Sequence, residues 1–150
     1  MKVLLQRVTA ASVRVESELT GRIDQGLVVF VGVSQDDSER DVKYLVDKVT
    51  NLRIFSDKDG KFNLSALEIQ GEMLVISQFT LLAKVQKGRR PSFTEAAPPE
   101  QAELLYNKFL DEICKTGIKV AMGRFQKHML VEINNDGPVT ILLDSKDKFG

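Results

Sequence analysis

The chain contains one long apolar run, Leu27-Val28-Val29-Phe30-Val31-Gly32-Val33, which follows Gly26 and precedes a polar segment. Consecutive apolar residues are typical of a strand that is covered on both faces, because a strand with one wet face would alternate. The run is far shorter than the roughly 20 residues that a membrane-spanning helix requires. We therefore predict a buried central strand in a soluble protein.

The residues on either side of this run predict further strands and a helix. Strand signals lie over residues 3–8 and 12–15. After the run, Ser38 stands three residues before Asp41, which is a variant of the capping box. Apolar residues then follow at helical spacing: Val42, Leu45, Val46, Val49 and Leu52. This pattern predicts an amphipathic helix directly after the central strand.

The middle of the chain predicts a strand, a long loop and a second helix. Residues 73–79 form another apolar strand pattern. Residues 82–99 lack periodicity, and loops of that length are often functional. The loop carries four basic residues, Lys84, Lys87, Arg89 and Arg90. Prolines at 98 and 99 open a helix that ends at Gly117. Its apolar face consists of Ala102, Leu105, Tyr106, Phe109, Leu110 and Ile113.

Three strand patterns close the chain, at residues 120–122, 129–133 and 139–143. Strands outnumber helices, and the two helices do not alternate with every strand. We predict a single α+β domain over residues 1–145, with a largely antiparallel, curled β-sheet or barrel and two main helices. Residues 146–150 are polar, and we expect them to form a tail that frays.

The composition limits the chemistry that the protein can perform. Twenty-one basic residues balance twenty-one acidic ones, which argues against a nucleic-acid coat protein, although a local basic patch can still bind RNA. Cys114 is the only cysteine and His128 the only histidine, so neither a Cys-His pair nor a zinc site is expected. The chain has no glycine-rich phosphate-binding motif. We therefore expect neither a metal nor a cofactor.

The single cysteine also bears on where the protein works. A lone cysteine cannot form an internal disulfide, and the N-terminus lacks the pattern of a signal peptide. Both observations predict a cytoplasmic protein without a membrane segment. Cys114 lies on or beside the apolar face of the second helix, where we expect a small buried thiol.

Three polar segments are candidates for a functional site. Ser77-Gln78-Phe79-Thr80 ends a buried strand, where polar side chains and free backbone N–H groups would meet solvent. The second segment is the basic stretch 87–93. The third is residues 135–140, whose Gly137-Pro138 step can form a sharp turn. Each segment also has a plain structural interpretation, as a strand terminus, a solvated loop and a hairpin turn respectively.

Together these segments resemble the D-aminoacyl-tRNA deacylase family. The resemblance spans nearly the whole chain in the right order. It is carried by Met1-Lys2-Val3-Leu4-Leu5-Gln6-Arg7-Val8, Gly32-Val33, Ser77-Gln78-Phe79-Thr80-Leu81, Gly88 with Arg90-Pro91-Ser92-Phe93, Leu105-Tyr106 with Phe109, and Asn135-Asp136-Gly137-Pro138-Val139-Thr140. One segment departs from the pattern: Phe125-Gln126-Lys127 stands where the family commonly has Phe-Gly-Ala, before the strand that contains Met129.

The resemblance implies a homodimeric hydrolase with its active site at the subunit interface. The enzyme would cleave the ester of D-aminoacyl-tRNA, and of glycyl-tRNA mischarged on tRNA-Ala, while rejecting L-aminoacyl-tRNA. In this family Gly137-Pro138 would form a cis peptide bond that enters the active site of the other subunit. The implied catalytic residues are Ser77, Gln78, Phe79 and Thr80, and the implied substrate-binding residues are Gly137, Pro138, Arg7 and Met129. The basic residues Lys84, Lys87, Arg89 and Arg90 would contact tRNA phosphates.

The chemical step has two candidate mechanisms. Thr80 could act as a nucleophile, but nothing in the sequence supplies a partner that would deprotonate it. The resemblance implies instead that the terminal 2′-OH of the tRNA positions or activates water, while backbone N–H groups around Phe79 and Thr80 stabilise the oxyanion. Two interpretations without catalysis also stay open: a tRNA-binding dimer and a structural β-rich dimer.

Overall fold

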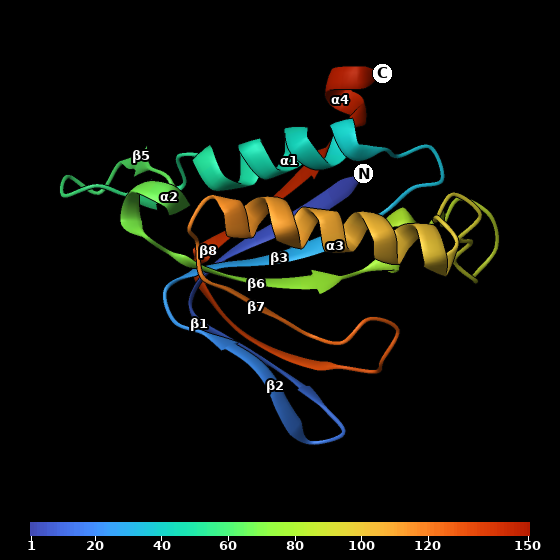
Figure 1. Ribbon diagram of the computed structural model, residues 1–150, viewed down its shortest axis with the longest axis horizontal. Helices are drawn as coiled ribbons and strands as arrows, with labels where there is room; N and C mark the ends of the chain where they lie inside the picture. The colour runs from blue at the N-terminus through green and yellow to red at the C-terminus, as the bar shows by residue number, and fades with distance from the viewer.

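The computed structural model describes residues 1–150 and is built on one six-stranded sheet with two long helices over one face (Figure 1). The strand order is β2-β1-β3-β6-β7, and β8 pairs with β1 as well. The strands are β1 (Lys2–Val15), β2 (Glu18–Ile23), β3 (Gly26–Gly32), β6 (Glu72–Ser77), β7 (Val120–Met122) and β8 (Leu130–Asp144). The remaining elements are helices α1 (Glu39–Asn51), α2 (Ala66–Ile69), α3 (Pro99–Lys115) and α4 (Lys146–Phe149), the 3₁₀ helix η1 (Phe79–Leu82), and a hairpin of β4 (Phe55–Ser56) and β5 (Phe62–Leu64). No helix is both long and apolar enough to cross a membrane.

The predicted central strand is β3, in which every residue except Phe30 is buried. The predicted α+β class is confirmed, and the sheet is mixed. β1 pairs antiparallel with β2, β3 and β8, whereas β3 pairs parallel with β6, and β6 pairs parallel with β7. The parallel pairs arise because the chain crosses over through α1 after β3 and through α3 after β6.

In two places, a pair of strands that the sequence predicts as separate is a single long strand in the structure. β1 covers both of the strands predicted near the N-terminus, and β8 covers the two predicted near the C-terminus. Along β8 the register shifts, because Asn135 lies opposite Val8 while Thr140 lies opposite Gln6. Residues 136–139 therefore bulge out of the ladder between two stretches that pair with the same neighbour. The segment around Gly137 is a bulge within a strand and not a hairpin turn.

Apolar clusters cover both faces of the sheet. The larger one lies between the sheet and the two long helices, and the smaller one lies on the opposite face, where the sheet curls. The predicted apolar face of α3 packs into the larger cluster, with Phe109 and Ile113 fully buried. Tyr106 on the same face donates a hydrogen bond from its hydroxyl to the carbonyl of Val75, at 2.7 Å. This bond ties α3 to β6.

Cys114 is exposed, so the prediction of a buried thiol is wrong. The buried residues of α3 form a stripe that ends at Leu110 on one side. Successive residues of an α-helix are about 100° apart, which places Cys114 just beyond the edge of that stripe. Its thiol therefore meets solvent in the last turn of α3.

The C-terminal residues are folded, so the prediction of a frayed tail is also wrong. Ser145 is fully buried, and its hydroxyl lies 2.8 Å from the α-amine of Met1, which donates to it. The helix α4 follows, and the ring of Phe149 packs edge-on against Tyr44 of α1, with 5.5 Å between centroids. Figure 1 shows α4 beside one end of α1 and near the N-terminus. These contacts hold a tail whose polar composition alone indicated disorder.

Candidate functional site

An open cavity of about 600 Å³ lies where β3 and β6 end. Clefts outside the carboxyl ends of parallel strands are common binding sites, because the chain leaves the sheet there and exposes loops. Four of the predicted site residues, Ser77, Gln78, Phe79 and Met129, line this cavity. The remaining lining residues are Val33, Ile76, Ala96, Ala97, Pro99, Ala102, Phe125, Gln126, Lys127, His128 and Val131.

The chain turns sharply at the end of β6. The backbone N–H of Gln78 still donates to the carbonyl of Val31, at 2.7 Å, and the next residues form the short 3₁₀ helix η1. The first N–H groups of a helix have no partner inside it. Phe79 and Thr80 are the first two residues of η1, so their N–H groups have no acceptor within this helix. They leave two backbone donors beside the cavity.

Gly32 allows this turn to lie close to β3. A Cβ atom at residue 32 would lie 2.7 Å from Cδ2 of Leu82 and 3.0 Å from the carbonyl oxygen of Gln78. A side chain there would push η1 away from the sheet. The glycine therefore sets the position of the N–H groups of Phe79 and Thr80.

Thr80 has no general base beside it. Its hydroxyl oxygen accepts a hydrogen bond from the amide Nε2 of Gln78, which is a donor and cannot remove a proton. His128 lines the same cavity, but no hydrogen bond joins it to Ser77 or Thr80. The geometry thus offers no activated hydroxyl nucleophile.

The basic loop borders the cavity through an aromatic contact. Phe93 packs edge-on against Phe79, with 4.9 Å between centroids, and Phe79 is 55% exposed. Two backbone hydrogen bonds of 2.8 Å between Lys84 and Ser92 close the loop. Its position next to the cavity is therefore fixed at both ends.

Only some of the cations in this loop are free. Lys84 forms an ion pair with Glu95 at 2.8 Å, and its hydrogen bond lowers the pKa of that carboxyl. Lys87, Arg89 and Arg90 are exposed and have no acidic partner within ion-pair distance. These three cations can therefore pair with an anion without first breaking an ion pair within the protein.

The opposite wall comes from the loop between β7 and β8. Met129 keeps its place in this wall, packed against Gly123, where an added Cβ atom would lie 2.3 Å from the Met129 sulfur. Gln126 has a φ of 61°, a left-handed conformation that costs most residues other than glycine about 1 kcal/mol or more. The departure from the family pattern therefore falls on a backbone position that favours glycine.

A second cluster of predicted residues surrounds the bulge in β8. Arg7 donates from Nη1 to the carbonyl of Ile54 at 2.9 Å and from Nε to the carbonyl of Asp136 at 3.2 Å. The guanidinium also lies 5.3 Å from the ring centroid of Phe62. The side chain is 11% exposed, so it is held between the β4–β5 hairpin and the bulge.

The bulge itself is braced from within. The Asn135 amide donates to the carbonyls of Arg7 and Val139, at 3.0 and 3.1 Å. The Gly137-Pro138 peptide bond is cis, and both residues are exposed. Gly137 has a φ of 123°, and a Cβ atom there would lie 2.9 Å from Cγ2 of Val139. The bulge therefore presents main-chain atoms to solvent on a firmly held base.

The two clusters lie at different ends of β3. Arg7 pairs with Leu27, whereas Ser77 pairs with Val31, four residues further along. That separation is about 13 Å at the usual rise of a strand. Figure 1 shows the bend of β8 at the end of the sheet away from the arrowhead of β6. Within a single chain, Arg7, Gly137 and Pro138 therefore lie outside the cavity described above. Thr80 is also absent from the cavity lining.

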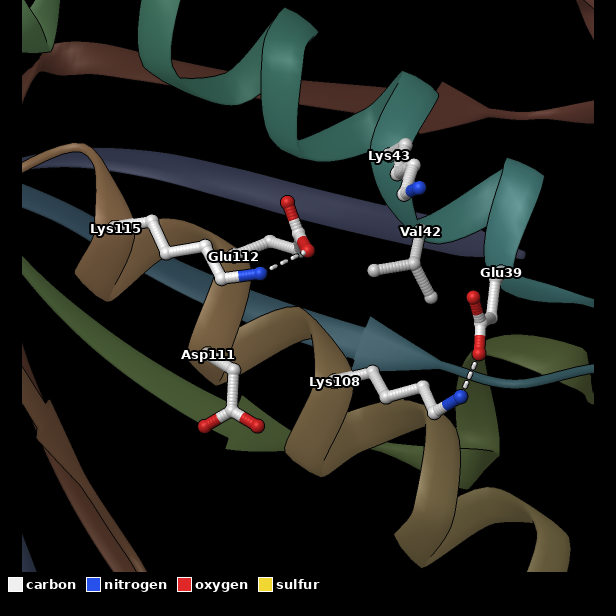
Figure 2. Close-up of a pocket in the computed structure, with 7 residues that line it drawn as sticks. All are labelled: Glu39, Val42, Lys43, Lys108, Asp111, Glu112 and Lys115. Atoms are coloured by element: carbon white, nitrogen blue, oxygen red, sulfur yellow. Dashed lines mark hydrogen bonds and ion pairs between the residues drawn. The ribbon is translucent and has the colours of Figure 1, made fainter.

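Another hollow, of about 310 Å³, lies between α1 and α3 (Figure 2). Its walls hold three lysines and three acidic residues, Lys43, Lys108, Lys115, Glu39, Asp111 and Glu112, with Val42 between them. Lys108 pairs with Glu39, and Lys115 pairs with Glu112. The three positive and three negative charges of the hollow balance, which is typical of a solvated groove between two surface helices.

Sequence reasoning missed part of the cavity wall. The segment Gln126–His128 and the alanines Ala96 and Ala97 carry no motif that predicts a binding site. The only signal for the first of these segments was its departure from the family pattern. The alanines gave no signal at all.

Comparison with known proteins identifies relatives over the full length of the chain. The model of the family described as D-Tyr-tRNA(Tyr) deacylase matches residues 4–144. A D-aminoacyl-tRNA deacylase of Natranaerobius thermophilus is 56% identical over 150 residues, covering 99% of this chain and 100% of that protein. One from Thermotoga petrophila is 54% identical over 149 residues, with 99% and 100% covered.

Solved structures share the fold of this chain. The structure named c-Myc DNA Unwinding Element Binding Protein superimposes with a TM-score of 0.90 at 44% identity, covering 96% of this chain and 98% of the other. A second structure, of a probable eukaryotic D-amino acid tRNA deacylase, has a TM-score of 0.83 at 18% identity over 95% of this chain and 97% of the other. At that identity the second match shows the fold alone.

Proposed function

This chain belongs to the D-Tyr-tRNA(Tyr) deacylase family, and on that premise we propose that it hydrolyses the ester bond between a D-amino acid and the 3′ end of tRNA. Water attacks the ester carbonyl, the bond to the ribose oxygen breaks, and free tRNA and D-amino acid are released. The chain is thus a hydrolase that acts on aminoacyl-tRNA. It works in the cytoplasm, where aminoacyl-tRNA is found.

One observation carries the assignment of the site: a largely apolar cavity lined by Phe79, the first residue of the helix η1, whose first N–H groups have no acceptor within that helix. The cavity takes the terminal nucleotide of the tRNA, so that the ester lies beside Ser77, Gln78, Phe79 and Thr80. The N–H groups of Phe79 and Thr80 then donate to the oxyanion that forms when water adds to the ester carbonyl. Preorganised donors of this kind contribute large rate effects because they need no rearrangement during the reaction.

The active site is completed by a second copy of the chain. Within one chain the Gly137-Pro138 bulge and Arg7 lie too far along the sheet to reach the cavity. An apolar row, Leu142, Leu4 and Phe30, crosses β8, β1 and β3 on the sheet face away from the helices, with Leu142 57% exposed. Exposed apolar residues in such a row favour contact with another protein surface. In this homodimer each bulge enters the cavity of the other subunit, beside Met129.

The inserted bulge sorts substrates by chirality. The carbonyls of Gly137 and Pro138 hold the α-amino group of the substrate, so an L side chain would meet main-chain atoms while a D side chain points to solvent. Arg7 and Asn135 hold the residues on either side of Gly137 and Pro138, because Arg7 donates to the carbonyl of Asp136 and Asn135 donates to that of Val139. Glycine has no side chain to clash, so glycyl-tRNA, including that mischarged on tRNA-Ala, is also cleaved.

The chemical step uses the substrate's own hydroxyl group. Thr80 has a donor and no base beside its hydroxyl, which disfavours attack by its oxygen. The terminal 2′-OH of the tRNA positions or activates the attacking water instead. Lys87, Arg89 and Arg90, with Lys84 at the base of their loop, contact phosphates of the acceptor end without reading sequence.

The first test asks whether the protein turns over. We expect chelator-treated protein to release D-tyrosine from a large excess of D-Tyr-tRNA in repeated turnovers. The matched measurement is binding of the same tRNA without an amino acid, by filter retention. Binding without release of D-tyrosine would contradict the proposal and would establish a non-catalytic tRNA-binding dimer. If the protein neither binds this tRNA nor releases D-tyrosine, the interpretation as a structural β-rich dimer would stand.

A further inference from the structure

The cavity has one formally charged side chain in its lining, Lys127. No carboxylate lines the cavity, and Lys127 is exposed and has no acidic partner within ion-pair distance. Most of the remaining lining is apolar. A cavity of this composition fits a flat, largely apolar ligand that carries one negative charge at its edge.

The loop that presents Lys127 is anchored on both sides. Phe125 stacks on Tyr106 of α3 with 6.1 Å between centroids, and Arg124 pairs with Glu18 at 3.5 Å. The backbone N–H of Lys127 donates to the carbonyl of Arg124 at 3.3 Å, closing a turn through the left-handed residue Gln126. These contacts fix the backbone from which the lysine side chain extends. They hold it in the lining of the same cavity as Phe79.

We propose that Lys127 is the phosphate-binding residue of the cavity and pairs with the 5′-phosphate of the terminal nucleotide of the tRNA. This inference rests on the proposed function. The base and ribose of that nucleotide occupy the apolar part of the cavity, which leaves its phosphate at the rim where Lys127 extends. An ammonium group suits a phosphodiester as a point charge, and no carboxylate of the cavity's own chain competes for it.

This role differs from that of the basic loop. Lys87, Arg89 and Arg90 lie outside the cavity lining and meet phosphates further along the acceptor end. Lys127 acts on the nucleotide that carries the ester, so it determines how that nucleotide is seated. Its contribution is therefore visible with a single nucleotide, whereas that of the loop requires a longer RNA.

The test measures binding of two non-hydrolysable probes. Both consist of D-tyrosine joined by an amide to 3′-amino-3′-deoxyadenosine, one with a 5′-phosphate and one without. We expect the wild-type protein to bind the phosphorylated probe about tenfold more tightly, the scale of one charge-assisted contact at a partly exposed position. Lys127→Gln should abolish this difference in affinity, because it should weaken binding of the phosphorylated probe only. Titration calorimetry at low salt gives both dissociation constants.

A matched control is Lys43→Gln, which removes the same charge from the hollow between the helices. It should keep the tenfold preference. Equal binding of the two probes by wild type, or a preference that survives in Lys127→Gln, would overturn the role of Lys127 while leaving the proposed function intact. Failure of both probes to bind would also overturn it, and release of D-tyrosine from D-Tyr-tRNA then decides separately whether the proposed function stands.

Discussion

Gly137→Ala is expected to lower kcat/KM for D-Tyr-tRNA by about a hundredfold or more, because misplacing a positioning group by about 1 Å has effects of that size. Gly137 has a φ of 123°, which an alanine rarely adopts. Its Cβ atom would also lie 2.9 Å from Val139 and 3.2 Å from Nη2 of Arg7. Val139 and Arg7 both hold the bulge, so the carbonyls that bind the substrate amine must move.

The control for this variant is Gly60→Ala. Gly60 also has a positive φ, of 77°, but an added Cβ atom there meets nothing within 4 Å. This variant should lose about 1 kcal/mol of stability from its backbone conformation while keeping its activity. Thermal unfolding of both variants shows whether each remains folded. If Gly137→Ala is folded and keeps the wild-type kcat/KM, the bulge does not take part in the active site.

A D-Tyr-tRNA that ends in 2′-deoxyadenosine is expected to be cleaved at least about a hundredfold more slowly than the natural substrate, the lower range for losing a group that assists proton transfer. The protein has no base beside Thr80 that could replace the missing hydroxyl. The ester must be attached at the 3′ position in both substrates. Single-turnover rates with saturating enzyme isolate the chemical step from binding.

Thr80→Ala is the complementary measurement on the protein side. It removes the hydroxyl but keeps the backbone N–H of residue 80, so its rate should stay within about threefold of wild type. A loss of a hundredfold or more in Thr80→Ala, together with normal cleavage of the deoxy substrate, would reverse the mechanism. Thr80 would then be the nucleophile.

Local pattern was sufficient for the central elements of the fold. The run at residues 27–33 was long and apolar enough to predict β3, and the helical spacing after Ser38 predicted α1. The continuity of β1 and β8 was not predictable, because the sequence pattern on the two sides of a bulge does not distinguish one bulged strand from two separate strands. Only pairing with a distant strand shows that residues 136–139 leave the ladder.

Long-range contacts explain the expectations that were wrong. The polar tail is held because Ser145 meets the amine of Met1, at the other end of the chain. Cys114 is exposed because it lies just outside the buried stripe of α3. Both depend on tertiary packing, which a local sequence pattern does not contain.

The candidate site was predictable in part. The segment Ser77–Thr80 was identified as the polar end of a buried strand, and Met129 was identified through the family resemblance. The cavity brings Ser77, Gln78, Phe79 and Met129 together. The wall formed by Gln126, Lys127 and His128 has no motif, and its role depends on which residues face it across the cavity. Residue spacing along the chain does not supply that information.

Chiral deacylation is tested by comparing D-Tyr-tRNA with L-Tyr-tRNA, side by side, at the same enzyme concentration. We expect rapid release of D-tyrosine while the L ester decays at the rate seen without enzyme, because an L side chain clashes with the main chain of the inserted bulge. Cleavage of both esters at similar rates would contradict chiral selection by Gly137 and Pro138. Survival of both esters would contradict the deacylase activity itself.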